Sequence, residues 1–88
     1  MLIDGVISMT GTIPFGEIVR YHRRRSGLTQ KELSDLAGVG MSSVFDIEKG
    51  KITVRLQTLI KVLNVLNISL ELKSPLMNDF RTRQISQK

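Results

Sequence analysis

The chain has 88 residues and no cysteine, and its 13 Lys and Arg residues outnumber its 8 Asp and Glu residues, giving a pI of about 10.1. This length suits one domain, whose core is marginal in a monomer and would gain from dimerisation. The composition excludes a disulfide framework and a thiolate metal site, and no apolar run approaches the ~18 residues that span a bilayer. The basic excess favours a polyanionic partner, although a merely solvated surface explains it equally well.

Residues 1–11 include glycines and lack a helical period, so we expect a flexible arm with, at most, an extended piece at Leu2–Ile7. The arm carries an acid and no basic stretch, which predicts no signal peptide and a cytoplasmic protein. The domain begins near Thr12, which can cap a helix ahead of Pro14. Apolar residues then recur at helical spacing and predict a helix over Ile13–Arg25.

The middle of the chain predicts two short helices joined by a tight turn. Thr29–Glu32 is a capping box, in which the threonine hydroxyl accepts from a helical N–H and the glutamate reaches back, so a helix should cover Gln30–Ala37. Gly38 suits the left-handed position that closes this helix. A third helix should cover Met41–Lys49 and stop at Gly50. This unit is a helix-turn-helix, which places its second helix in the DNA major groove.

A fourth helix is expected from about Arg55 to Leu66. Its core-facing apolar stripe should consist of Leu56, Leu59, Ile60, Leu63 and Leu66. Val62 and Val65 widen the apolar face beyond what a small monomer needs, which suggests a partner surface.

Residues 67–73 alternate apolar and polar side chains, a pattern typical of a strand with one buried face. A lone strand leaves its backbone unpaired, so the economical partner is the same strand of a second copy about a two-fold axis. Residues 74–88 are polar and basic, and we expect a flexible tail. The sequence therefore predicts an all-α domain of four to five helices over residues 12–73, with one C-terminal β-strand pairing across a homodimer. The expected dimerisation residues are Val62, Val65, Ile68, Leu70 and Leu72.

Exposed side chains on the third helix can contact base edges, and the candidates are Met41, Ser42, Phe45 and Asp46. Ser42 can donate or accept, Asp46 can accept from cytosine N4, and Met41 or Phe45 can contact a thymine methyl. Expected phosphate contacts are Gln30, at a helix N-terminus, together with Ser43, Lys49, Lys51 and Arg55. Structural interpretations stay open: Phe45 can be a packing residue, and Asp46 can pair with a neighbouring arginine. Arg23 is expected to pair with Glu48.

Catalytic constellations are missing from the sequence. It has one histidine, no acid pair at a catalytic spacing, no glycine-rich phosphate loop after a strand and no cluster with metal-ligand spacing. We therefore expect no enzymatic activity, no cofactor and no metal site.

These motifs together resemble the Xre/Cro family of helix-turn-helix regulators over residues 15–66. The resemblance is carried by Gly27–Gln30 with Leu33, Ala37–Val39 and Ile47–Lys51. It implies DNA binding as a dimer and usually repression. It also implies an internal salt bridge between Arg23 and Glu48, a phosphate contact at Gln30, and base-facing positions at Met41, Ser42 and Asp46.

The C-terminal part narrows the resemblance further. Lys51–Leu59, followed by Leu63, Leu66 and the alternating Ile68–Leu72, resembles HipB-type antitoxins and their Y4mF-like relatives, in which a strand that pairs across the dimer replaces a fifth helix. This resemblance implies a type II toxin–antitoxin system, repression of its own operon and a HipA-like kinase toxin as partner. Two alternatives remain: an orphan Xre-family regulator without a toxin, and a protein-interaction module that uses the helix-turn-helix as a scaffold.

Overall fold

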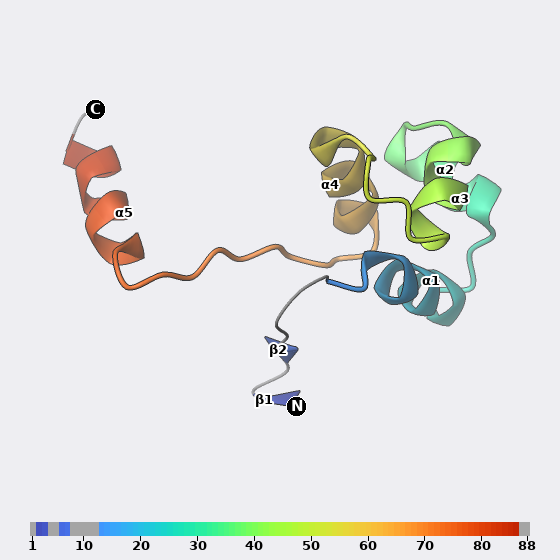
Figure 1. Ribbon diagram of the computed structural model, residues 1–88. Helices are drawn as coiled ribbons and strands as arrows, with labels where there is room; N and C mark the ends of the chain where they lie inside the picture. Colours follow the sequence, from blue (N-terminus) through green and yellow to red (C-terminus); the bar gives the residue numbers. More distant parts are fainter. Residues whose placement is uncertain (1, 4–5, 8–12, 87–88) are drawn as a thin grey trace.

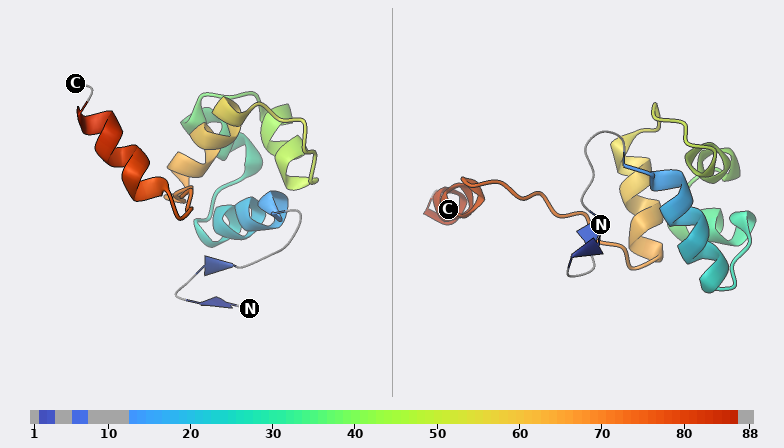
Figure 2. Two further views of the ribbon diagram at one scale, coloured as in Figure 1. Left: turned by 60° about the vertical axis from the view of Figure 1, so that its left-hand side comes forward. Right: turned by 60° about the horizontal axis from the view of Figure 1, so that its bottom comes forward.

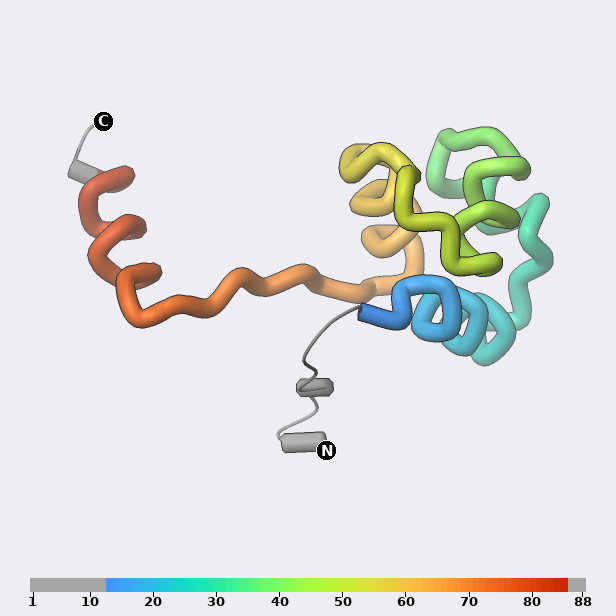
Figure 3. The backbone as a smooth tube through the Cα atoms, in the orientation of Figure 1, coloured from blue at the N-terminus to red at the C-terminus, as the bar shows by residue number. Residues whose placement is uncertain are grey.

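A computed structural model describes residues 2–3, 6–7 and 13–86 of the chain. Four helices form the body: α1 (Phe15–Arg25), α2 (Gln30–Ala37), α3 (Met41–Glu48) and α4 (Leu56–Val65). A fifth helix, α5 (Met77–Ser86), stands apart from the body at the end of an extended segment (Figures 1 and 3). The short strands β1 (Leu2–Ile3) and β2 (Val6–Ile7) pair antiparallel, within the stretch where the sequence predicts an extended piece.

The core lies at the centre of the four-helix body, and every one of the four helices contributes to it (Figure 2). Its buried apolar residues are Val19, Leu33, Val44, Ile47, Leu59, Val62, Leu63 and Leu66. Phe15, Val54 and Ile68 pack against this cluster from its edges. The core therefore holds the helix-turn-helix, α2 and α3, rigidly against α1 and α4.

Local signals explain the bounds of α2. The Thr29 hydroxyl accepts from the Glu32 N–H at 3.0 Å, and the Thr29 N–H donates to the Glu32 carboxylate at 2.8 Å, which confirms the predicted capping box. Gly38 closes the helix in the left-handed region, with φ 71°. The Val39 N–H then donates to the Ser34 carbonyl at 3.0 Å, so the chain turns sharply into α3.

Close approach of α1 to the end of α3 depends on Gly16. A Cβ at this position would lie 2.6 Å from the Ile47 carbonyl oxygen and 2.9 Å from that of Glu48. Both neighbours are backbone atoms, which cannot yield as a flexible side chain does. A side chain at position 16 would therefore push α1 away from the helix-turn-helix.

The structure corrects the predicted orientation of α4. Val62, expected at a dimer interface, is 0% exposed, and Val65 packs against the core. Leu56 and Ile60, expected in the core, are exposed instead. Apolar residues cover most of the circumference of this helix, so periodicity alone does not select its inner side. Contact with α2 selects it, and turns Leu59, Val62 and Leu63 inward.

The C-terminal part also differs from expectation. Residues 67–73 form no strand in this single chain, because a strand needs a hydrogen-bonded partner and none of the described residues pairs with this segment. After α4, Asn67 adopts φ 59° and the Ile68 N–H donates to the Leu63 carbonyl at 2.9 Å, a turn that directs the chain away from the body. The segment expected to be a structureless tail contains α5. In residues 13–86, none of the helices combines the length and apolarity of a membrane span.

Candidate nucleic-acid interface

The outer face of α3 carries an exposed strip of side chains. Val44 and Ile47 point into the core, so Met41, Ser42 and Phe45 face outward. Met41 is 52% exposed and Phe45 is 47% exposed, which makes both available to a partner. The expected base-reading residues therefore share one surface on α3.

Asp46 lies at the edge of this strip and is half-buried. Its carboxylate is 3.7 Å from the Lys51 ammonium, so its neighbouring cation is a lysine and not the arginine considered from the sequence. Phe45 has a cation of its own, since the Lys49 ammonium lies 5.1 Å from the centre of its ring. Asp46 and Phe45 therefore each lie beside a lysine side chain.

Cations and hydroxyls gather beside α3, where the chain enters α4. A hollow of about 310 Å³ is lined by Ser43, Asp46, Lys51, Thr53, Val54, Arg55 and Thr58. Lys51 and Arg55 are exposed, and Ser43 is half-buried. Arg55 precedes the first turn of α4, and no side chain caps the N–H groups of that turn. Three of the expected phosphate contacts, Ser43, Lys51 and Arg55, therefore line one hollow at the start of α4, together with the Asp46 carboxylate.

A buried carboxylate joins α1, α2 and α3 behind this surface. The Glu48 side chain is 1% exposed and accepts from Arg23 Nε at 2.6 Å and from Arg23 Nη2 at 3.0 Å. The remaining guanidinium nitrogen of Arg23 donates to the Leu28 carbonyl at 2.9 Å, in the turn between α1 and α2. The predicted pair of Arg23 with Glu48 is therefore present and is bidentate.

Gln30, expected to contact phosphate, donates through Nε2 to the Glu48 carboxylate at 3.1 Å. An amide has a second N–H, so Gln30 can be held by Glu48 and still donate outward from the start of α2. Arg20 was not expected in this cluster. Its Nη2 donates to the Glu48 carbonyl oxygen at 3.1 Å, and its Nε is 3.6 Å from the Glu48 carboxylate. Its spacing of three residues from Arg23 on one helix was the available signal.

The charges of this cluster set the protonation of Glu48. Burial raises the pKa of Glu48, but hydrogen bonds from Arg23 and Gln30 and the positive charges of Arg23 and Arg20 lower it further, so the pKa lies below the ordinary value. The hydrogen bond to Glu48 raises the pKa of Arg23 despite burial. Both groups are therefore ionised at neutral pH, and the cluster holds the helices as an ion pair.

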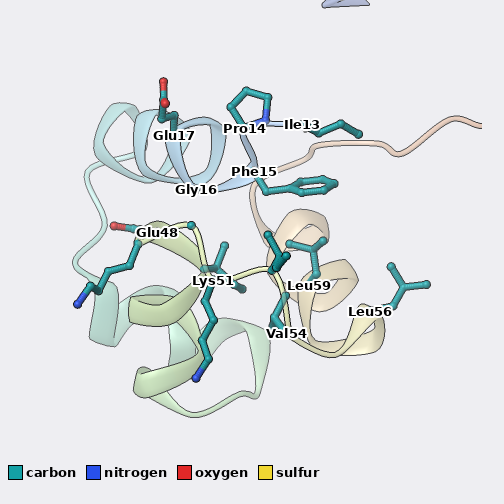
Figure 4. A pocket seen from close by; sticks show the side chains of 14 residues that line it. Ile13, Pro14, Phe15, Gly16, Glu17, Glu48, Lys51, Val54, Leu56 and Leu59 are labelled. Atoms are coloured by element: carbon teal, nitrogen blue, oxygen red, sulfur yellow. The ribbon is translucent and has the colours of Figure 1, made fainter. Parts of the chain in front are cut away.

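A second hollow lies outside this surface, between the start of α1 and the loop from α3 to α4. Its volume is about 580 Å³, and Figure 4 shows Phe15, Val54 and Leu59 turned toward one another within it. Among the residues that the structure describes, no group of three His, Cys, Asp or Glu side chains could hold a metal ion. The lining of this hollow is mainly apolar and also includes Glu17, Glu48, Lys49 and Lys51.

Comparison with known proteins agrees with this geometry. The family model described as Helix-turn-helix matches residues 19–73. The chain belongs to this helix-turn-helix family. It is 37% identical over 60 residues to the uncharacterized HTH-type transcriptional regulator y4mF of Sinorhizobium fredii, covering 68% of this chain and 79% of the relative.

Solved structures share the fold. A chain in the structure of a HipA-HipB-O2-O3 complex and a chain in a HipB-O4 20mer complex each match with a TM-score of 0.64 and 23% identity. Each match covers 77% of this chain and 99% of the other. The helix-turn-helix fold inferred from the sequence is thereby confirmed.

Proposed function

We propose that the protein is a dimeric, sequence-specific DNA-binding repressor in which α3 enters the major groove. The observation that carries this proposal is the exposed strip of α3 beside a cationic helix N-terminus. A partner that fits both surfaces must offer hydrogen-bonding edges next to regularly spaced anions. Duplex DNA has this combination, because its base edges lie between two rows of phosphates.

Sequence readout is assigned to Met41, Ser42, Phe45 and Asp46. In the free protein Asp46 is neighboured by Lys51, which lowers the repulsion between its carboxylate and DNA phosphates. When Lys51 moves to a phosphate, Asp46 is released to accept from cytosine N4. Ser42→Ala should therefore weaken binding mainly at one base position, whereas a loss equal for all sequences would argue against base readout.

Phosphate binding is assigned to Gln30, Ser43, Lys49, Lys51 and Arg55. Each neutralised phosphate should make log affinity fall by about 0.9 per decade of salt concentration. Lys51→Ala should therefore weaken all DNA sequences similarly and reduce the salt slope by about one phosphate. Lys73→Ala is the matched control, since the exposed Lys73 side chain alternates with the apolar Leu70 and Leu72 and is not among the expected phosphate contacts, so both quantities should stay unchanged.

The dimer is assigned to the extended segment after α4. Leu70 and Leu72 are exposed in the single chain, and Ile68 is half-buried at the edge of the core. Pairing of this segment with the same segment of a second copy would satisfy its backbone and cover both leucines. Leu70→Pro removes one backbone N–H and should abolish the dimer; if the dimer survives, the strand assignment is wrong.

Resemblance to HipB-type proteins supports a role as the antitoxin of a toxin–antitoxin operon, repressing that operon and binding a HipA-like kinase toxin in the cytoplasm. The support is the fold shared with chains from the HipA-HipB and HipB-DNA structures and the sequence likeness to y4mF. An orphan regulator is the second candidate. Co-purification of the protein with the product of a neighbouring kinase-like gene would support the antitoxin. Absence of such a gene and of any such complex would support the orphan regulator.

One binding experiment separates these proposals from a scaffold that binds only protein. Fluorescence anisotropy with random-sequence and selected duplexes should show salt-dependent binding to both and tighter binding to the selected one. No binding to either duplex by the folded protein would favour a protein-interaction module that uses the helix-turn-helix as scaffold.

A further inference from the structure

Helix α5 has an apolar face that the body of its own chain does not cover. Figure 1, Figure 3 and the right-hand view of Figure 2 show it at a distance from the four-helix body. Leu76, just before the helix, and Phe80 are one helical turn apart and are 72% and 55% exposed. Ten residues fall short of the ~12–15 that an isolated helix needs to be stable in water. A contact that covers Leu76 and Phe80 would therefore also stabilise the helix.

Two charged residues, Asp79 and Arg83, lie along one edge of the apolar face of α5 and indicate which kind of partner would cover that face. Leu76, Asp79, Phe80, Arg83 and Gln84 line a shallow hollow of about 400 Å³ on α5. Asp79 and Arg83 are four residues apart on the same edge, yet neither makes an ion pair within the part of the chain that the structure describes. An acid and a base on one edge of an apolar face form a surface that is complementary to itself.

We propose that α5 pairs antiparallel with α5 of a second copy about a two-fold axis, forming a dimer contact separate from the body. With the axis near residue 81, Phe80 of each copy lies close to Phe80 of the other. The same arrangement sets Asp79 of each copy against Arg83 of the partner subunit, so each ion pair occurs twice. The inference rests on the proposed homodimer and adds α5 to its interface.

The chain leading to α5 is long enough for this pairing. Residues 67–73 are the segment proposed to pair about the two-fold axis, and residues 74–76, which can span about 10 Å, connect it to α5. Because the paired strands start near the same axis, this short connection can bring the two α5 helices together while α3 of each copy remains free to face DNA. A separate acidic or basic partner would leave either Arg83 or Asp79 beside a like charge, which disfavours it relative to a second copy.

Charge reversal in the full-length chain tests the pairing by sedimentation velocity over a dilution series. Asp79→Arg and Arg83→Asp should each raise the dimer Kd at least about fivefold, since each turns two attractions per dimer into two repulsions. The double variant with both changes restores opposite charges and should return the Kd to within about twofold of the original. Asn78→Arg, which adds charge on the opposite side of α5, is the control and should leave the Kd within about twofold.

The possible outcomes separate this inference from the proposed function. If neither single charge reversal changes the dimer Kd, or if the double variant does not restore it, the α5 pairing is wrong, but the proposed homodimer is not contradicted. A protein that stays monomeric at every concentration overturns both. If Asp79→Arg changes binding to DNA or to another protein without changing the dimer Kd, α5 has a different occupant and the pairing is wrong. Thermal melts at a concentration where every variant is monomeric should coincide, because α5 lies outside the core.

Discussion

Replacing Arg23 with methionine should destabilise the body by about 3 kcal/mol, because it leaves the Glu48 carboxylate buried without its main partner. The structure supports a value of this size, since the Glu48 side chain is 1% exposed and loses two hydrogen bonds, at 2.6 and 3.0 Å. Gln30 and the more distant Arg20 remain and keep the loss from being larger. The change also removes the donor to the Leu28 carbonyl in the turn before α2.

Removing both charges should cost much less. In the Arg23→Met, Glu48→Leu double variant no charge is left buried, and the remaining cost, about 1 kcal/mol, comes mainly from the unpaired Leu28 carbonyl. The double variant should therefore be more stable than Arg23→Met alone by about 2 kcal/mol, and Glu48→Leu alone completes the double-mutant cycle that gives the coupling energy.

Urea denaturation followed by circular dichroism measures each free energy of unfolding. In a domain of this size 1 kcal/mol shifts the Tm by about 4–8 °C, so Arg23→Met should lower it by about 12 °C or more. A loss below about 1 kcal/mol for Arg23→Met would refute the reasoning, as would a double variant as unstable as the single one.

Three further predictions follow from the contacts of the body. Thr29→Ala should lower the free energy of unfolding by about 1 kcal/mol, because α2 loses its N-terminal cap. Thr53→Ala, in an exposed turn, is the control and should lower it by less than about 0.5 kcal/mol in the same urea titration. Gly16→Ala should cost about 2 kcal/mol or more, because its Cβ meets backbone oxygens, whereas at Gly40 the nearest atom is 3.7 Å away and the cost should stay under about 1 kcal/mol. The third prediction concerns pH, because the pKa of Glu48 is lower in the folded protein than in the unfolded chain. The ionised Glu48 carboxylate therefore stabilises the folded state fully above about pH 6. This stabilisation is lost as the pH falls through the unfolded pKa of about 4.3 toward the lower folded pKa. Between about pH 6 and 3 the free energy of unfolding should therefore fall more steeply in the original protein than in the Arg23→Met, Glu48→Leu double variant. Equal pH dependence of the two proteins would contradict the lowered pKa of Glu48.

Local signals made the helix-turn-helix predictable from sequence. The capping box at Thr29 and the left-handed Gly38 act within a few residues, so α2 has the predicted bounds. Pairing of Arg23 with Glu48 was also predictable, because a buried acid on α3 needs a cation and α1 carries several.

The orientation of α4 and the existence of α5 were not predictable in this way. Apolar residues lie nearly all around α4, so only packing against α2 decides that Val62 is buried and Leu56 is exposed. Helix α5 has few apolar residues and only a narrow apolar face, and its pattern resembles that of a solvated tail. Strand pairing at 67–73 depends on a second chain, so it remains a prediction.

A DNase footprint of the purified protein on the DNA upstream of its own gene, in about physiological salt, tests the central claim most directly. We expect a protected palindrome whose half-sites are about 10 base pairs apart, or a multiple of that. The Lys51→Ala variant should lose this protection although it remains folded. An unprotected region at concentrations where the protein is folded and dimeric would contradict the assignment of the α3 surface to operator DNA.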